Sequence, residues 1–362
     1  MSDYEIRRYD TSGNLLGIIP VFHKLTTVRT ENTVGAFELV VPSGVYLYED
    51  FSPNQVFEVW RNKYGGFELQ GETAYFLRDW IISSDGFISL YGYDANWLLS
   101  TRIVAYAAGS AQAEMTDYAD DMMKAVVIDN FGADAATARQ LADLTIAGDL
   151  SASQSLTKAF SRRNVLDVCQ DLAEAATEAG TRTYFDVVRT SAGKFEFRTY
   201  TGQRGQDHSR TSGDVRLVGE QYGNFEDVEF GTYHSNEVNY VYAGGQGEED
   251  AREIVEVSDS DRIASGYPFN RCEGFVDARN ADATASITAE ANAGLGEGKP
   301  KQILTGRLVD TPGLQYGIHY GFGDILSANA FGYSVDCHVR SVKVSVDSNR
   351  GEQIEARLQG EL

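Results

Sequence analysis

The sequence predicts a β-rich α+β protein in which two β sections flank a central α/β section. Glycine reaches 36 residues while proline is limited to 6, a pattern typical of many strands joined by glycine turns. Short runs of β-branched and aromatic residues fill the first hundred and the last sixty residues, whereas helical spacing of apolar residues is strongest in the middle. The 362 residues, 42% of them hydrophobic, can supply the cores of two or three domains.

The first section, residues 4–98, reads as strands almost throughout. Turn signals at 62–66 and 84–86 separate runs that combine β-branched and aromatic residues with partial alternation. Short strands at this spacing predict a small barrel or sandwich. The expected strands are 37–41, 56–60, 67–69, 80–82 and 87–93.

The middle section is predicted to be α/β. Apolar residues at Met115, Tyr118, Met122 and Val126 have helical spacing, which predicts a helix over 110–132 closed by a glycine. For a second helix the expected N-cap is Ser161, the apolar stripe runs from Val165 to Ala176, and Gly180 ends it. Strands at 183–188 and 194–200 follow, and then a polar connector at 203–214.

The last section is predicted to consist of strands interrupted by an insertion. An acidic, glycine-rich loop is expected at 244–250, and an alanine-rich helix at 279–293 that ends at Gly294. The expected strands are 225–230, 237–242, 302–309, 325–327, 335–346 and 353–358.

The formal net charge of −22, with a pI near 4.6, disfavours partners that carry many phosphate groups. Such an acidic surface repels phosphate, so stable binding of nucleic acid or of an anionic membrane is disfavoured, although DNA can still pass nearby. The first ten residues lack the apolar core of a signal peptide, and no apolar run approaches the roughly 20 residues of a membrane span. We therefore expect a soluble protein that is made in the cytoplasm and does not bind membranes.

Motifs for nucleotide binding are incomplete. Asp310-Thr311-Pro312-Gly313 matches the DxxG element of GTP-binding proteins, but the segment 294–299 follows a helix and departs from the phosphate loop GxxxxGK[ST]. A proline turn is the expected structure at 310–313. The glycines at 244–247 and 321–323 do not precede a helix, so they are expected in hairpins.

No catalytic, cofactor-binding or metal-binding residue is predicted, and no cofactor is expected. Cys169, Cys272 and Cys337 are too far apart for a CxxC pair, and the five histidines have no HxxxH or HExxH spacing. The segment 259–261 is not a twelve-residue EF-hand loop. The carboxylate clusters are interpreted as solvated faces: Asp117, Asp120, Asp121, and Glu248, Glu249, Asp250.

Two other functions stay open at this point. The abundant carboxylates would suit a cell-wall hydrolase, a glycosidase or a peptidase, but a sequence cannot show the separation of two carboxylates that a glycosidase needs. Exposed tyrosine and tryptophan residues would suit a carbohydrate-binding module for host adhesion. Trp97, at a strand-to-helix junction, is expected to be a core anchor rather than a sugar platform.

Several short segments, in order along the chain, resemble the gp37-like tail proteins of siphophages, the ReqiPepy6 group. The first closes the N-terminal β section and reads GYDANWLLSTRIV, at 92–104. The others are RRNVL at 162–166, DLA at 171–173, SNEV at 235–238, RCEGFVDAR at 271–279 and GDIL at 323–326.

The resemblance implies a baseplate or tail-tip hub of the Tal/gp27-like class. In such hubs two tail-tube-like β-barrels per subunit form a ring of three subunits, which matches the sixfold tail tube above and the threefold tip below. It implies a barrel at 1–98, an α/β domain at 99–214, and a second barrel at 215–362 with an insertion at about 246–300. It further implies a non-enzymatic virion protein that assembles in the host cytoplasm and forms a channel wall for DNA. The implied partners are its own homotrimer, the distal tail protein and tail tube ring, the tape measure protein, and tail-tip or receptor-binding proteins.

Overall fold

The computed structural model describes residues 4–63, 65–105, 113–160, 162–247, 252–266, 268–279, 284–347 and 351–361. The chain forms two compact units. Unit 1 comprises Met1–Val228 and Gly306–Gln359, and unit 2 comprises Glu229–Thr305 and Gly360–Leu362. The predicted division at residues 98 and 214 is a finer one and stays a prediction.

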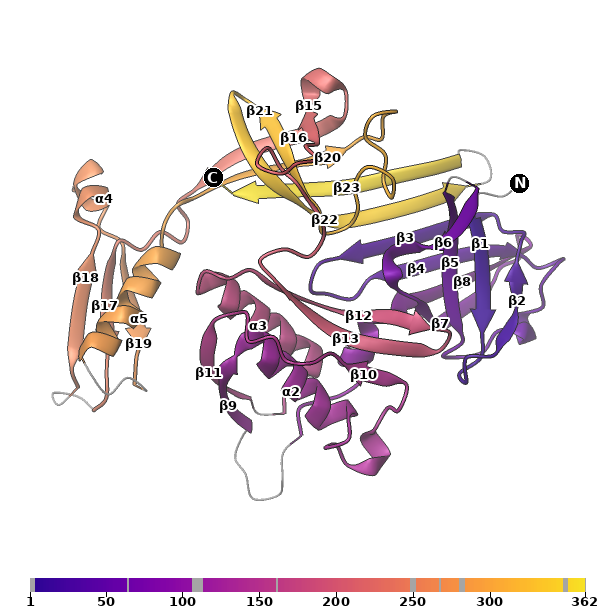
Figure 1. The fold of residues 1–362 in the computed structure, drawn as a ribbon, viewed down its shortest axis with the longest axis horizontal. Coiled ribbons are helices and arrows are strands. Elements are labelled where there is room, and N and C mark those ends of the chain that lie inside the picture. Colours follow the sequence, from indigo (N-terminus) through magenta and orange to yellow (C-terminus); the bar gives the residue numbers. More distant parts are fainter. Residues whose placement is uncertain are drawn as a thin grey trace. The chain divides into compact units, whose positions relative to one another are not determined.

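Unit 1 contains most of a sheet of 15 strands (Figure 1). Its main path runs in the order β16-β20-β23-β22-β3-β4-β8-β7-β5-β1-β2, and β6, β14, β15 and β21 pair beside this path. The strands from the N-terminal part are β1 (Tyr4–Tyr9), β2 (Leu15–Ile19), β3 (Lys24–Thr30), β4 (Ala36–Pro42), β5 (Val56–Lys63), β6 (Gly66–Leu69), β7 (Tyr75–Ile82) and β8 (Phe87–Asp94). The others are β14 (Asp207–His208), β15 (Leu217–Gly219), β16 (Phe225–Tyr233), β20 (Lys301–Leu308), β21 (Ile325–Ala330), β22 (Tyr333–Asp347) and β23 (Gly351–Glu361).

The two β sections of the sequence meet in one antiparallel pair. β22 is 15 residues long, and its second half pairs with β23 on one side and with β3 on the other, from Ser341 opposite Thr30 to Asp347 opposite Lys24. In the described residues the path has free ends at β2 and β16, and no closed barrel is found. The β-rich α+β class is therefore confirmed, but the two separate barrels are not.

The strands alternate as a half-buried sheet requires. In β8, Ile88 and Leu90 are fully buried while Tyr91 and Tyr93 are exposed. Gly92 lies on the buried side, where a Cβ atom would come within 2.3 Å of the Phe76 carbonyl oxygen on β7. The glycine thus lets two paired strands approach each other at this position.

The α/β section of unit 1 packs two helices, α2 (Ala119–Phe131) and α3 (Val165–Glu178), against strands (Figure 1). β10 (Leu144–Ile146), β13 (Lys194–Thr201) and β12 (Thr183–Ser191) form a three-stranded sheet, and β9 (Ala113–Tyr118) pairs with β11 (Ser155–Phe160). The short helices of unit 1 are α1 (Trp97–Ser100) and the 3₁₀ turns Tyr48–Asp50, Gln70–Glu72, Thr137–Arg139 and Glu220–Tyr222. One core cluster joins α2, α3, β12 and β13 to Val56 and Phe76 of the large sheet.

The helix predicted over 110–132 is wrong in its first part. Residues 113–118 are β9, which pairs in register with β11, and α2 begins only at Ala119. Pairing with a segment about 40 residues away overrides the helical spacing of Met115 and Tyr118. Ser161, the predicted N-cap of α3, lies outside the described residues, and the Asn164 side chain caps this helix by accepting from the Leu166 N–H at 2.9 Å.

Unit 2 is a three-stranded sheet with one long helix on a face (Figure 1). β17 (Tyr240–Gly244) is central, β18 (Ile254–Ser258) is antiparallel to it, and β19 (Glu273–Asp277) is parallel. α5 (Thr284–Glu297) covers this sheet, and α4 (Ser260–Ser265) follows β18. A small core of Val241, Ala243, Ala278, Ile287 and Ala291 holds the unit together.

The helix predicted at 279–293 is displaced along the sequence. Gly294 does not end it, because α5 continues to Glu297. A Cβ atom at Gly294 would lie 2.6 Å from the Val276 Cγ2 atom, so this glycine lets the helix lie close to β19. In the predicted loop at 244–250, Gly244 belongs to β17, and Glu248, Glu249 and Asp250 lie outside the described residues.

Candidate functional site

The residues that the sequence singled out for chemistry are dispersed. Cys169 and Cys337 are fully buried, and burial raises the pKa of both thiols, that of Cys337 to about 12. Neither therefore supplies a reactive thiolate at neutral pH. Among the described residues, no group of three His, Cys, Asp or Glu side chains is arranged to hold a metal ion.

The segment 310–313 is a turn, as predicted. Thr311 and Leu314 exchange backbone hydrogen bonds of 3.0 and 2.9 Å. The Asp310 carboxylate accepts from the Tyr320 hydroxyl at 2.9 Å and from the Tyr316 N–H at 3.1 Å. This aspartate stabilises its own loop.

The prediction that Asp120 and Asp121 lie on a solvated face is wrong, although Asp117 is exposed. Asp120 accepts from the Ser153 N–H at 3.0 Å and from its hydroxyl at 2.7 Å. Asp121 pairs at 3.0 Å with Lys124, whose side chain is fully buried. Asp121 also accepts from the Ser151 N–H at 2.8 Å. Both carboxylates thus attach α2 to the loop before β11, so their role is to hold the α/β section together.

A buried charge cluster lies where the large sheet meets the α/β section. The Asp186 carboxylate on β12 pairs with Arg29 of β3 at 3.2 Å and with Arg204 at 2.5 Å. Burial opposes ionisation of Asp186, but the two guanidinium groups outweigh it and lower its pKa. The Asn96 side chain joins the cluster by accepting from the Val187 N–H at 2.7 Å. The cluster thus connects β3, β12 and the end of β8.

Asp94 lies in the same region but forms no ion pair with another described residue. Its carboxylate accepts from the Asn96 N–H at 3.2 Å and is 2% exposed. Burial raises its pKa to about 7, and the Asp186 charge adds to this effect, whereas Arg29 opposes it. Asp94 is therefore a carboxyl group that changes charge near neutral pH.

A second buried carboxylate, Glu58, joins β5 to β12. It accepts from the Arg189 Nε atom at 2.7 Å, from the Trp60 Nε1 atom at 3.0 Å and from the Tyr9 hydroxyl at 3.2 Å. Arg7 lies over the Trp60 ring at 3.9 Å from its centroid. These contacts again join parts of the fold.

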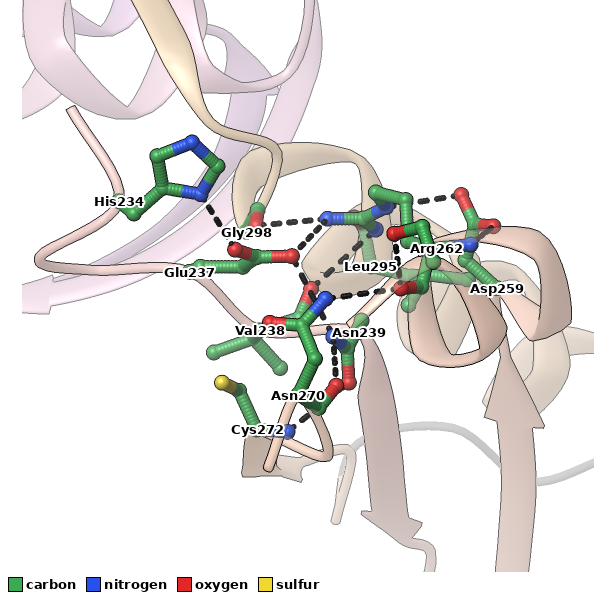
Figure 2. Close-up of polar contacts among 11 residues, drawn as sticks. His234, Glu237, Val238, Asn239, Asp259, Arg262, Asn270, Cys272, Leu295 and Gly298 are labelled. Carbon is green, nitrogen blue, oxygen red and sulfur yellow. Dashed lines mark hydrogen bonds and ion pairs between the residues drawn. The ribbon is translucent and has the colours of Figure 1, made fainter. Parts of the chain in front are cut away.

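Unit 2 has its own polar cluster, centred on Arg262 of α4 (Figure 2). The guanidinium donates to the carbonyl oxygens of Gly298 at 3.0 Å, Val238 at 3.3 Å and Leu295 at 3.3 Å. It also pairs with Asp259 at 2.8 Å. Asp259, in the segment weighed for calcium, instead caps α4 by accepting from the Arg262 N–H at 3.0 Å.

Figure 2 shows a second chain of contacts around Glu237 and Asn239. Glu237 accepts from His234 at 2.7 Å, and this hydrogen bond is the main cause of its lowered pKa. Asn239 donates to the Asn270 carbonyl oxygen at 2.7 Å and accepts from the Cys272 N–H at 2.9 Å. Other residues of unit 2 supply these partners, so the cluster stabilises the loops of this unit.

The edge strand β2 of unit 1 carries exposed apolar side chains. β2 forms an end of the large sheet, and the side chains of Leu15, Leu16 and Ile18 on it are 54%, 44% and 47% exposed. An exposed apolar edge strand is a surface on which further chains can pair or pack. Sequence reasoning missed it, because the alternation in this short segment does not reveal which strand ends the sheet.

In the part of the chain that the structure describes, no helix has the length and apolar character needed to span a membrane.

Comparison with protein families identifies a match over nearly the whole chain. The family model described as Siphovirus ReqiPepy6 Gp37-like protein matches residues 5–358. A comparison with the curated proteins finds no match.

Three solved structures with a similar fold are described as tail proteins. The 43 kDa tail protein of prophage MuSo2 from Shewanella oneidensis has a TM-score of 0.57 and 11% identity, and the match covers 98% of this chain and 97% of that chain. A tail protein from Neisseria meningitidis MC58 has a TM-score of 0.55 and 13% identity over 99% and 97%. The prophage tail protein gp18 from Listeria monocytogenes EGD-e has a TM-score of 0.55 and 10% identity over 98% and 94%.

Proposed function

The chain belongs to the family of Siphovirus ReqiPepy6 Gp37-like proteins and is a phage tail or baseplate structural protein, and on that premise we propose that it forms a trimeric hub at the tail tip. In this proposal the hub adapts the sixfold tail tube to a threefold tip and forms a channel wall through which DNA passes. The main support for this proposal is that the family match and the similarity to the fold of a tail protein both extend over nearly the whole chain.

The arrangement of the large sheet supports a subunit with two tube-like halves. Strands β1–β8 form one half, strands β14–β16 and β20–β23 form the other, and the β3–β22 pair joins them. Three such subunits would present six similar halves to a sixfold tube. We propose residues 1–98 and 215–362 as the two hub domains and 99–214 as the α/β domain between them. The proposed insertion at about 246–300 overlaps unit 2.

The β2 edge supports association with neighbours. β2 pairs with β1 on one side and with no described strand on the other, and it carries three large exposed apolar side chains. These features favour a permanent interface, for which roughly 2,000 Å² or more of buried surface is typical. The proposed partners are two further copies of this chain, the distal tail protein with the tail tube ring, the tape measure protein, and tail-tip or receptor-binding proteins.

The net charge of −22 suits DNA in transit. An acidic wall repels each phosphate, so DNA would slide along it without adsorbing. We propose that the protein acts without catalysis, assembles in the host cytoplasm and remains in the virion.

The decisive experiment is electron microscopy of assembled tails that contain this protein. The expected result is three copies in a ring around a central channel, with the acidic side chains on its wall. A single copy per tail, or a basic channel, would overturn the proposal. Hydrolysis of purified peptidoglycan that is lost on substitution of one Asp or Glu would replace it with the hydrolase function.

A further inference from the structure

An aromatic cavity lies in unit 1 between the large sheet and the α/β section. Its volume is about 270 Å³. Phe76 of β7, Trp97 of α1, Phe131 of α2 and Phe195 of β13 line it. The Phe76 ring centroid lies 5.5 Å from that of Trp97 and 5.3 Å from that of Phe195, so three aromatic side chains form one continuous wall.

The cavity opens to solvent beside two exposed residues. Thr11, in the turn between β1 and β2, and Asn54, before β5, line its outer part. A ligand can therefore enter without unfolding of the core. The space suits one aromatic ring or one branched aliphatic group, since sites for larger ligands run to several hundred Å³.

The rim of the cavity carries positive charge, although the whole chain is strongly acidic. Arg102 lines the cavity, and its guanidinium lies over the Phe131 ring at 5.5 Å from the centroid. Arg78 lies over the Trp97 ring at 4.5 Å. The lining carboxylate, Asp143, is ion-paired with Lys194.

Arg102 also has a donor that the protein leaves unused. Its Nη1 atom donates to the Thr101 carbonyl oxygen at 3.1 Å and hydroxyl at 3.2 Å. Its Nε atom is buried and has no hydrogen-bond partner among the described residues. The protein therefore leaves the hydrogen-bonding capacity of this guanidinium partly unused, at a cost in free energy. An anionic acceptor in the cavity would form a charge-assisted hydrogen bond with the guanidinium.

We propose that this cavity binds a carboxylate that carries one aromatic or branched aliphatic group. The apolar group lies among Phe76, Trp97 and Phe195, and the carboxylate accepts hydrogen bonds from Arg102. Such a ligand is either a free small acid or the C-terminal residue of another chain. Both sources share the chemistry that the cavity recognises.

Isothermal titration calorimetry of the full chain with 3-phenylpropionate and with the neutral 3-phenylpropanamide tests the proposal. Saturable binding of the acid, roughly ten- to a hundredfold tighter than that of the amide, is the expected result. Equal affinities for the two compounds, or no saturable binding of the acid, would overturn it. This comparison needs no variant, so a folding defect cannot obscure it.

Variants then locate the site. Arg102→Met should reduce the affinity for the acid to that for the amide, while Arg307→Met, which removes an exposed guanidinium ion-paired with Glu226, should leave it unchanged. Leu141→Trp should fill the cavity and abolish binding of both compounds, with folding checked by circular dichroism. Unchanged acid binding in both Arg102→Met and Leu141→Trp would show that the ligand binds elsewhere.

The source is distinguished with N-acetyl-Ala-Phe and its C-terminal amide. Tighter binding of this peptide acid than of 3-phenylpropionate assigns the cavity to a chain terminus, and weaker binding assigns it to a small acid. A peptide amide that binds as tightly as the peptide acid would contradict carboxylate recognition.

Discussion

Single residues at the junction between the large sheet and the α/β section combine burial with charge. Asp186 stays ionised because Arg29 and Arg204 both contact it. Among the described residues, Asp94 accepts from the backbone N–H groups of Gly35 and Asn96, and Arg29 is more distant from it. Two aspartates in one buried region thus differ in protonation, and the difference makes stability depend on pH.

Because the pKa of Asp94 is raised, we expect the free energy of unfolding to fall as the pH rises. Its pKa is about 7 in the folded protein against an ordinary value of 3.8, so between about pH 4 and 7 the folded state holds a proton that the unfolded state has released. The free energy of unfolding should therefore fall through this window, by at most about 4 kcal/mol from this group. Asp94→Asn should flatten the fall, which urea denaturation between pH 4 and 8 measures.

The matched control is Asp79→Asn, which changes an exposed aspartate on β7. It should leave the pH dependence of the wild type in place. If Asp94→Asn and the wild type show the same slope, Asp94 is not the titrating group.

At the scale of elements, glycines determine how closely strands and helices approach each other. The absence of a side chain at Gly92 lets β8 lie close to the β7 backbone, and the same absence at Gly294 lets α5 lie close to Val276 of β19. Neither position reveals this role in the sequence, where Gly92 resembles an ordinary strand residue and Gly294 resembles a helix stop.

Gly92→Ala is expected to destabilise unit 1. The added methyl group would lie 2.3 Å from the Phe76 carbonyl oxygen, so β7 and β8 must separate, at a cost of about 1–3 kcal/mol. The control is Ser89→Ala, because Ser89 lies on the same strand and faces the opposite side of the sheet. Equal urea midpoints for the two variants would contradict the close approach.

Arg262→Met is expected to loosen unit 2 selectively. It removes the donor to three carbonyl oxygens, and the small core of the unit cannot compensate for roughly 2–4 kcal/mol. Hydrogen exchange followed by mass spectrometry should show faster exchange across 229–305 and no change in unit 1. Arg271→Met, an exposed arginine on the same unit, should not do this.

The sequence predicted most strands and the second helix because their patterns are local. It failed at β9, where Met115 and Tyr118 have helical spacing but pair with β11, and at Asp120, whose partner Ser153 lies 33 residues away. The sequence also did not predict the aromatic cavity. Trp97 was identified as a core anchor, yet the residues that complete the cavity come from distant parts of the chain, such as Thr11, Phe76 and Phe195.

For the whole molecule, the free β2 edge links the fold to assembly. Leu16→Lys with Ile18→Lys places charges on an edge that the proposed ring would cover, so tails built with this variant should lack the ring while the subunit still folds. Val45→Lys with Leu47→Lys changes two exposed apolar residues outside the strands and is the control. Intact rings with the β2 variant would remove this edge from the interface.

The chain leaves the large sheet along β16 and returns along the adjacent β20. The segment between these two strands is thus an insertion whose ends lie side by side in the sheet. Such an arrangement makes unit 2 exchangeable in evolution, because a longer, shorter or different segment can be spliced between these strands without a change in the order of the rest of the sheet. Relatives of this protein should accordingly vary most in length between the counterparts of Tyr233 and Lys301.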